Sequence, residues 1–340
     1  MILKNLIKNS SHQLLLPFYH MVCDVAPSYV DLLYKPRSVA KFKTDLDAFL
    51  THYKPISLAD IIAINKGEKE LTEPSFHLTF DDGLSNFKDI VAPILLEKRI
   101  PATVFLNTDF VDNKALFYRY KANLIYRFYN DNYETDLKKI FDLKIHQLNN
   151  IIAKKQGEET SRFSNASELS VLDFLFQMEY ENSAYLDDLA QEVNFSFEDF
   201  LEKETPYLSL IDIKALEKQG ITFGGHSANH PNYKDLSLID QLQQTRSSLN
   251  WIKKNLNQKD LVFSFPFSDI GISKSFFNEM TYGMAISFGT SGFKTDEIVS
   301  NLQRLDMEKY KRSATSVLTT EYLKLGVKKV LGKDKIWRKE

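Results

Sequence analysis

The sequence has 340 residues but only one cysteine, Cys23, and no long apolar run. A single cysteine excludes an intramolecular disulfide and a zinc site built on cysteine thiolates. Since a transmembrane helix needs roughly 20 apolar residues, no integral membrane segment is expected. The first residues are amphipathic but lack the apolar core and cleavage site of a signal peptide. We therefore expect a cytoplasmic protein, with peripheral membrane association through residues 1–9 left open.

A strong net charge is also missing, because the formal charge at pH 7 is only −2. This balance gives no reason to expect nucleic acid as a partner. Apolar residues are plentiful, at 43% of the chain, and aromatic residues make up 13%. The chain can therefore bury a sizeable core. So many rings fit either a large core or a groove that stacks on sugars, and composition alone leaves both open.

Short β-branched and aromatic runs alternate with segments of helical periodicity along much of the chain. Strands are predicted at residues 14–20, 76–80, 101–107, 221–226, 261–266 and 284–288. Helices are predicted at residues 38–53, 85–98, 211–220, 239–255 and 272–280. Repeated βα units predict parallel strands, and their economical closure is a barrel with active groups at the carboxyl ends of the strands.

Residues 108–210 interrupt this alternation. They are mostly helical in pattern, rich in charged and aromatic residues, and poor in β-branched runs. We interpret them as a helical insertion within a single domain of residues 1–340, rather than as an independent domain. Loops on the catalytic face are where barrels of this kind adapt their specificity.

Two adjacent carboxylates, Asp81 and Asp82, follow the strand at residues 76–80, and Gly83 permits a tight turn after them. An ordinary Asp-Gly turn is one interpretation. The other is functional, because neighbouring residues at a strand end point in different directions and can take different roles. One carboxylate could bind a metal ion while the other takes a proton from water.

His226 and His230 follow a second predicted strand, where Gly224 and Gly225 let the backbone approach its neighbours closely. Core or surface histidines would explain such a pair by itself. Two histidines and one carboxylate leave an open position on a zinc-like ion, as catalytic sites require. With a second carboxylate as base, the four residues predict a site that hydrolyses an amide or an ester.

The segments Thr79-Phe-Asp-Asp-Gly and His226-Ser-Ala-Asn-His-Pro resemble the first two signature motifs of the polysaccharide deacetylases, the NodB-homology or carbohydrate esterase family 4 group. The resemblance covers residues 76–107 and 211–290. It implies a distorted (β/α)7-type barrel that removes N-acetyl or O-acetyl groups from sugars. It also implies that Asp81 is the general base and that Ser227 fixes the second loop. The metal, often zinc, would be held by Asp82, His226 and His230.

The third motif of that family, Arg-x-Pro-Tyr/Phe-Gly, is only partly matched. Ser264-Phe-Pro-Phe-Ser stands in its place, with Pro266 and Phe267 retained but neither the Arg nor the Gly. The backbone N–H of Phe267 is the natural donor to an oxyanion. Arg304, near the last strand, could substitute for the missing Arg or form a surface salt bridge. We assign Arg304 and Pro266 to the residues that bind substrate.

Many family members carry a late histidine that protonates the leaving amine, whereas this chain has no histidine after His230. His20 is the candidate acid, because it follows the first predicted strand and could reach the same barrel rim. The alternative is a buried structural histidine. The Tyr-His pair resembles the circularly permuted members that deacetylate poly-β-1,6-N-acetylglucosamine, and we group Tyr19 with the substrate-binding residues.

The sequence therefore predicts a metal-dependent hydrolase that removes N-acetyl groups from an N-acetylated sugar or glycan. A precursor sugar made inside the cell fits the expected location better than an extracellular polymer. The runner-up is a carbohydrate-binding pseudoenzyme of the same fold, because the motif Arg and the late His are missing. An amidase or esterase for a non-sugar substrate is a third hypothesis.

Overall fold

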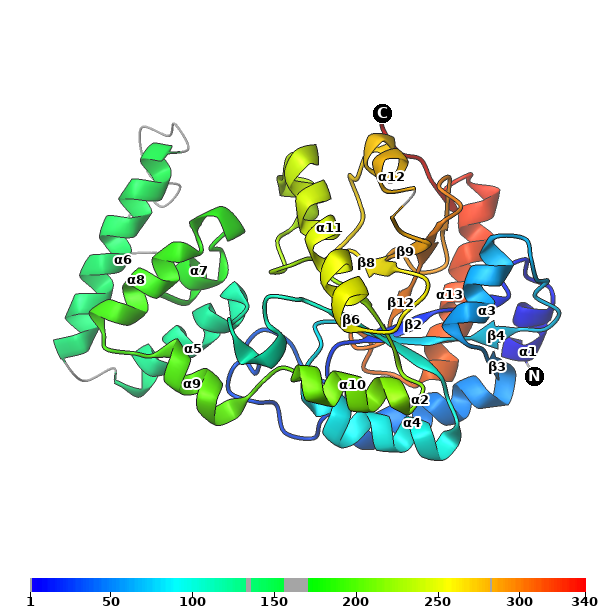
Figure 1. The fold of residues 1–340 in the computed structure, drawn as a ribbon, viewed down its shortest axis with the longest axis horizontal. Helices are drawn as coiled ribbons and strands as arrows, with labels where there is room; N and C mark the ends of the chain where they lie inside the picture. The colour runs from blue at the N-terminus through cyan, green and yellow to red at the C-terminus, as the bar shows by residue number, and fades with distance from the viewer. Residues whose placement is uncertain (1, 133–135, 156–170, 282) are drawn as a thin grey trace. The chain divides into compact units, whose positions relative to one another are not determined.

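The computed structural model describes residues 2–132, 136–155, 171–281 and 283–340 (Figure 1). The chain divides into two compact units. The larger comprises residues up to Asp24 together with Pro36–Asn113 and Pro206–Glu340. The smaller comprises Val25–Lys35 and the described part of Lys114–Thr205. All the candidate site residues belong to the larger unit.

A parallel sheet of eight strands forms the centre of the larger unit. In spatial order these strands are β11 (Asn301–Gln303), β9 (Ile286–Gly289), β8 (Val262–Ser264), β7 (Thr222–Gly225), β6 (Ala102–Leu106), β5 (Leu78–Phe80), β2 (Pro17–Tyr19) and β12 (Leu305–Asp306). Most of their residues are buried, as expected for strands covered on both faces.

The two outer members of this sheet, β11 and β12, are separated in the sequence by Arg304 alone. The segment 301–306 therefore acts as one strand that pairs with β9 through its first half and with β2 through its second half. At the junction, the backbone N–H of Arg304 donates to Gly289 (3.1 Å) and that of Leu305 donates to Leu16 (2.8 Å). The sheet thus closes through this segment, which confirms the predicted seven-strand type of distorted (β/α) barrel.

Helices surround the sheet of the larger unit (Figure 1). They are α1 (Ile2–Lys8), α2 (Val39–His52), α3 (Leu58–Asn65), α4 (Ala92–Lys98) with the π-helical turn η1 (Phe87–Val91) before it, α10 (Leu210–Lys218), α11 (Leu238–Asn255), α12 (Lys274–Met280) and α13 (Ala314–Val330). Six of them begin after a serine whose side chain accepts a hydrogen bond from the first turn, which fixes where each helix starts. These serines are Ser38, Ser57, Ser209, Ser237, Ser273 and Ser313.

Short elements complete this unit. A small sheet has the order β1 (Leu14–Leu15), β4 (Ser75–Phe76) and β3 (Lys54–Pro55), and β10 (Thr295–Asp296) pairs with β13 (Lys335–Ile336). Two 3-10 turns are η2 (Val111–Asn113) and η4 (Tyr233–Asp235). The pairing of β10 with β13 brings the end of the chain back to the barrel.

The smaller unit is helical in the part that the structure describes. Its elements are α5 (Tyr118–Asp131), α6 (Asp136–Lys155), α7 (Val171–Phe176), η3 (Tyr180–Asn182), α8 (Ala184–Glu192) and α9 (Phe197–Glu204). Between the two metal motifs the described chain is therefore mostly helical. Residues 108–113 and 206–210 of the predicted insertion belong to the larger unit. The smaller unit also includes Val25–Lys35, whose Asp31 accepts hydrogen bonds from Asn123 and Arg127.

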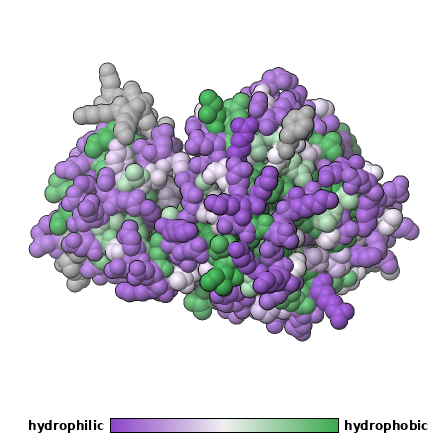
Figure 2. Space-filling view, in the orientation of Figure 1, coloured by the Kyte–Doolittle hydropathy of each residue, from purple (hydrophilic) through white to green (hydrophobic). Residues whose placement is uncertain are grey.

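None of the helices within the described ranges combines the length and the apolarity needed to cross a membrane. The face shown in Figure 2 is mostly hydrophilic, with apolar residues scattered over it. Scattered apolar residues are ordinary on a folded protein.

Candidate active site

The chain turns sharply where β5 ends, and this turn separates the two adjacent carboxylates. Asp82 and Gly83 both lie in the left-handed region, with φ values of 73° and 63°. This φ strains any residue with a side chain, and a Cβ at position 83 would also lie 2.7 Å from the end of the Leu106 side chain, so glycine is favoured there. For Asp82 this backbone conformation is unfavourable, and such strain is concentrated at functional sites. Asp81 and Asp82 thereby take different partners.

Asp82 lies beside the two histidines that follow β7. Its Oδ1 atom is 3.5 Å from Nε2 of His226 and 3.3 Å from Nε2 of His230. One ligand atom from each of these three residues lies within 4.8 Å of the others, and all three residues are buried. The structure therefore brings together the three residues that the sequence predicts as metal ligands.

The chemistry of these three side chains fits a divalent cation. Oδ1 of Asp82 is buried, yet it accepts no hydrogen bond from the described part of the chain. Nδ1 of His226 lies 2.7 Å from the carbonyl oxygen of Ser264. This contact makes Nδ1 the protonated nitrogen and leaves the lone pair of Nε2 facing Asp82. Two imidazoles and one carboxylate are a donor set that catalytic zinc sites use.

The electrostatics favour the ligand forms of these groups. Burial lowers the pKa of His226 to about 4, so its imidazole is neutral at pH 7. Burial also opposes ionisation of Asp82, but its interactions with the neighbouring histidines, those with His230 first among them, outweigh burial and lower the pKa of Asp82. A neutral imidazole beside an ionised carboxylate is the state in which both can hold a cation.

The loop after β7 is held by side chains on both sides. Ser227 and His230 have left-handed φ values of 68° and 62°. The hydroxyl oxygen of Ser227 accepts the backbone N–H of His230 at 2.9 Å, and Asn107 donates to the carbonyl of His226. Ser227 thus spans the loop between the two histidines, where the resemblance placed it.

Asp81 forms a two-pronged ion pair with Arg304 inside the barrel. The Nη1 and Nη2 atoms of Arg304 lie 2.7 and 2.8 Å from Oδ1 and Oδ2 of Asp81. The guanidinium also donates to the hydroxyls of Thr79 (3.0 Å) and Ser264 (2.6 Å). Arg304 is fully buried and lies 4.4 Å above the ring of Phe18. This parallel arrangement is the strong, directional form of an Arg–carboxylate pair.

These contacts correct two expectations about Arg304. It is neither a surface salt bridge nor a residue that touches substrate, because it has no exposed surface. Its partner Ser264 occupies the position of the missing motif Arg, and the short serine side chain leaves room for a guanidinium that arrives from the segment between β11 and β12. The remaining sequence hypothesis, in which Arg304 substitutes for the motif Arg, agrees with where the side chain lies.

His20 is paired with a carboxylate that the sequence did not reveal, Glu308. The Nδ1 atom of His20 lies 2.6 Å from Oε2 of Glu308. The same carboxylate accepts the backbone N–H groups of His20 and Met21, each at 2.9 Å. Glu308 is nearly buried, with 8% of its side chain exposed, whereas 30% of the His20 side chain remains exposed. This fixes the ring with Nε2 at the far side from Glu308.

The carboxylate changes the proton affinity of His20. Burial by itself would lower the pKa of the ring. The charge and hydrogen bond of Glu308, helped by the charges of Asp82 and Asp81, outweigh burial and raise the pKa of His20 to about 10. His20 is therefore protonated at neutral pH, as an acid that donates a proton must be.

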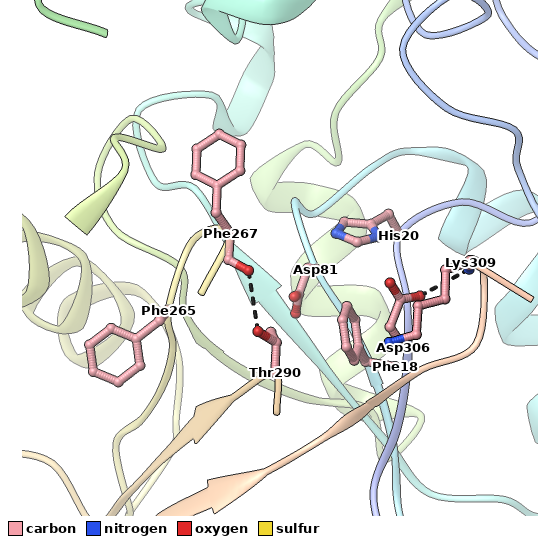
Figure 3. A pocket seen from close by; sticks show the side chains of 8 residues that line it. All are labelled: Phe18, His20, Asp81, Phe265, Phe267, Thr290, Asp306 and Lys309. Carbon is pink, nitrogen blue, oxygen red and sulfur yellow. Dashed lines mark hydrogen bonds between the residues drawn. The ribbon is translucent and has the colours of Figure 1, made fainter. Parts of the chain in front are cut away.

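One pocket brings three predicted catalytic residues together (Figure 3). Its volume is about 240 Å³, and its lining comprises Phe18, His20, Asp81, Phe265, Phe267, Thr290, Asp306 and Lys309. In Figure 3 the side chains of His20 and Asp81 lie side by side, with the backbone of Phe267 across from them. These residues come from the ends of three different strands, as the barrel topology requires.

Phe267 sits at the tip of a tight turn after β8. Its φ is 57°, and the N–H of Ser268 donates to the carbonyl of Pro266 at 2.6 Å, so the turn contains three residues. The hydroxyl of Thr290 lies 3.3 Å from the carbonyl of Phe267. Phe267 is 37% exposed, and the centre of its ring lies 4.7 Å from that of His230.

Two of the predicted substrate-binding residues, Tyr19 and Pro266, do not line the pocket. Tyr19 is fully buried, and its hydroxyl donates to Asp45 on α2 at 3.0 Å, so it faces away from the pocket. Because side chains alternate along a strand, its neighbour Phe18 faces the pocket instead. Pro266 is also buried and shapes the turn before Phe267. Neither is positioned to touch substrate.

Comparison with known protein families matches residues 68–149 and 202–281 to the family described as polysaccharide deacetylase. The two segments contain Asp81, Asp82, His226, His230 and Phe267 and lie on either side of most of the helical insertion. No curated protein matches the chain significantly.

Several solved structures share the fold. The Streptococcus pyogenes deacetylase PplD in complex with acetate is 13% identical, with a TM-score of 0.56 and coverage of 91% of this chain and 97% of its own. IcaB from Ammonifex degensii is 13% identical, with a TM-score of 0.53 and coverage of 92% and 98%. A de-N-acetylase from Aggregatibacter actinomycetemcomitans is 14% identical, with a TM-score of 0.53 and coverage of 90% and 99%. At such identities the likeness establishes the barrel fold.

Proposed function

We propose that this chain, which belongs to the polysaccharide deacetylase family, is a divalent-metal-dependent hydrolase that removes N-acetyl groups from an N-acetylated sugar or glycan. One observation carries the proposal. One pocket is lined by both Asp81 and His20. The buried Arg304 fixes the orientation of the Asp81 carboxylate, and the carboxylate of Glu308 pairs with His20. Beside this pair, Asp82, His226 and His230 offer the ligands for a cation.

Asp82, His226 and His230 would hold the cation, and zinc fits two imidazoles and one carboxylate. When bound, it supplies positive charge that polarises the amide carbonyl and eases deprotonation of water. The chain's own residues supply the remaining steps, which are described next.

Asp81 is proposed to take the proton from the attacking water. Burial alone would raise the pKa of this carboxyl, but the Arg304 guanidinium outweighs burial and lowers it, so Asp81 is ionised at neutral pH. Arg304 also holds both oxygens of the carboxylate in one orientation. Since Arg304 touches no solvent, it acts through Asp81 as a positioning residue.

The backbone N–H of Phe267 is proposed to donate to the oxygen that becomes negative when water adds to the acetyl carbonyl. His20 then gives its proton, through Nε2, to the sugar nitrogen as the C–N bond breaks. The products are acetate and a free amine. Glu308 keeps His20 protonated until that step and holds the ring in place.

The carbohydrate-binding pseudoenzyme remains the alternative to test. It was favoured by the missing motif Arg and the missing late His. Arg304 now contacts Asp81 from another strand, and His20 lines the pocket from β2 with Glu308 behind it. Both observations support catalysis over binding alone, and acetate release decides between the two hypotheses.

Release of acetate from a panel of substrates tests the proposal. The zinc-loaded protein is incubated with N-acetylglucosamine oligomers, N-acetylated lipid-linked and nucleotide-linked sugars, O-acetylated sugars and N-acetylated peptides. We expect acetate and a new amine from one or more N-acetylated sugars, but none from the peptides. Release from none of the sugars would overturn the proposal, whereas turnover confined to peptides would favour the non-sugar amidase.

Glu308→Gln is expected to move the basic limb of the kcat–pH profile. His20 must be protonated to act, so activity is lost as pH rises through its pKa, which Glu308 raises to about 10. Glutamine removes the charge and leaves burial, which lowers the pKa of the ring. The limb should therefore shift to lower pH by about one unit or more. His20→Ala should lower kcat by about 10² or more and remove this limb.

Glu321→Gln is a matched control for that variant, because Glu321 is another nearly buried carboxylate of the same unit and accepts a hydrogen bond from Tyr310. It should leave the basic limb unchanged. The assignment of His20 as the acid is wrong if His20→Ala retains both kcat and the limb.

A further inference from the structure

The last residues of the chain return to the loop that carries Phe267. After α13, β13 pairs with β10, and the backbone N–H of Lys274 donates to the carbonyl of Lys339 at 2.8 Å. Between these contacts lies Arg338, whose side chain is 1% exposed. A buried arginine two residues from the end of a chain is costly unless its charge is matched.

Arg338 uses all five of its N–H donors. Nε donates to Asp296 at 2.9 Å, and Nη1 donates to the carbonyls of Asp269 (2.8 Å) and Ile272 (3.2 Å). Nη2 donates to the carboxylates of both Asp269 and Asp296. A guanidinium has no further donor to offer, so the site is built for arginine. The side chain joins the end of the chain to the segment that follows Phe267.

Asp269 stands two residues after Phe267 and is fully buried. Its Oδ2 atom accepts hydrogen bonds from Asn301 (2.8 Å) and Gln303 (2.7 Å) in addition to Arg338, and its Oδ1 atom accepts the N–H of Thr290 at 3.3 Å. The carboxylate thus ties the turn to the end of β9 and to β11.

Close packing against β9 fixes the position of the Asp269 carboxylate. A Cβ added to Gly289 would lie only 2.3 Å from the carboxyl group of Asp269, so the backbone of β9 runs directly against it. Thr290, the next residue, donates its backbone N–H to Asp269 and its hydroxyl to the carbonyl of Phe267 (3.3 Å). A shift of Asp269 is therefore passed to Phe267 through Thr290 and through the chain itself.

The turn needs such support because Phe267 is strained. Its φ of 57° places a bulky residue in the left-handed region, a conformation that persists only where neighbours enforce it. The neighbours that do so are Thr290 and, one step behind it, Asp269 with Arg338.

We propose that Arg338 is a positioning residue for catalysis: the end of the chain, through Arg338 and Asp269, sets the place of the Phe267 N–H. The inference rests on the proposed deacetylation. Without Arg338, Asp269 and Asp296 are two buried carboxylates that share the amides of Asn301 and Gln303. Their repulsion moves Asp269, and the Phe267 turn relaxes with it.

Loss of Arg338 should lower kcat rather than raise KM, because an oxyanion donor acts mainly on the transition state. A displacement of about 1 Å costs about 10²-fold in rate. The metal ligands are held by other contacts, which include the bond from Nδ1 of His226 to Ser264. Metal content should therefore be unaffected.

Two truncated chains that differ only in Arg338 provide the test, one ending at Arg338 and the other at Trp337. Both chains lose the contact between Lys339 and Lys274, so a difference between them does not come from that loss. For the N-acetylated sugar that the full chain turns over, the chain ending at Trp337 should have about a 100-fold lower kcat. Its KM and zinc content should stay within about threefold of those of the full chain, and the chain ending at Arg338 should match the full chain.

An activated acyl group separates positioning from general destabilisation. The carbonyl of an N-trifluoroacetyl sugar accepts water readily and depends less on the oxyanion donor, so the loss of kcat should shrink to about tenfold or less. Equal losses for both acyl groups would overturn the proposal, as would an unchanged kcat. If the chain ending at Trp337 does not fold, Arg338→Lys in the full chain, which keeps the charge but not five donors, decides by the same comparison.

These outcomes are distinct from failure of the proposed function. A full-length, zinc-loaded protein that releases no acetate from any N-acetylated sugar refutes deacetylation and, with it, the role of Arg338. A fully active protein whose chain ending at Trp337 is folded and equally active refutes the role of Arg338 alone.

Discussion

Asp81→Asn is expected to lower kcat for acetate release by about 10³-fold while zinc binding and the fold are retained. Asparagine has the shape of aspartate and can still accept a hydrogen bond from Arg304 with its side-chain oxygen. It cannot take a proton from water at neutral pH. Because Asp82, His226 and His230 are unchanged, the variant should bind zinc as the parent does. Steady-state kinetics and metal analysis of the same preparation check this.

Asp45→Asn is the matched control for Asp81→Asn. Asp45 is also fully buried in the larger unit and paired with an arginine, since its Oδ1 atom lies 2.6 Å from Nη2 of Arg37. Both substitutions remove one charge from a buried ion pair, so both should lower stability. Only Asp81→Asn should lower kcat by about 10³-fold. An Asp81→Asn variant within about tenfold of the parent in kcat would show that another group is the base.

Arg304→Met should both destabilise the protein and inactivate it. Removing one partner of a buried ion pair costs about 3–5 kcal/mol, because the other charge is left uncompensated. Asp81 would then be a buried, unpaired carboxyl, and burial would raise its pKa. As the base must be ionised, the acidic limb of the kcat–pH profile should shift to higher pH. We expect kcat at neutral pH to fall by about 10² or more, measured beside denaturant unfolding.

Moving the arginine from position 304 to position 264 tests directly whether Arg304 replaces the family's motif Arg. Ser264 occupies the position of the family's motif Arg, and its hydroxyl lies 2.6 Å from Nη2 of Arg304. The double variant Ser264→Arg, Arg304→Ser returns the guanidinium to that position. It should recover kcat at least about tenfold over Arg304→Ser alone and move the acidic limb back to lower pH. A double variant no better than the single one would show that Arg304 does more than orient Asp81.

The features that could be predicted from the sequence are those set by local chemistry. Residues adjacent in the sequence determine the strand before Asp81, the left-handed turn at Gly83 and the spacing of His226 and His230. Parallel strands place their carboxyl ends at the same rim, so these motifs had to meet once the βα alternation was recognised. Helix starts were equally readable, as at Ser38, which caps α2.

The features that sequence reasoning missed, as for Glu308, or left open, as for Arg304, depend on barrel closure. Arg304 and Asp81 are 223 positions apart, and Glu308 and His20 are 288 positions apart. They meet only because the segment 301–306 pairs with β9 and β2 at once. The short β11 and β12 flank Arg304 and carry little periodicity of their own. A glutamate two residues beyond such a strand has no local signal that would mark it as the partner of an early histidine.

The error at Tyr19 has a different cause. In a strand of only three residues, Pro17–Tyr19, alternation predicts that neighbours face opposite sides but not which one faces the pocket. Both Phe18 and Tyr19 are aromatic, so composition does not decide between them. The phase is set by packing, since Tyr19 lies against Phe42 and Phe80 while Phe18 lies under Arg304.

The most direct test of the central claim is a titration of metal-free protein with zinc, in which acetate release from an N-acetylated sugar oligomer is measured at each step. We expect the rate to rise until one equivalent per chain is bound, and Asp81→Asn to bind zinc in the same titration with about 10³-fold less turnover. Acetate release that is undiminished in metal-free protein, or restored equally by zinc in Asp81→Asn, would contradict that claim.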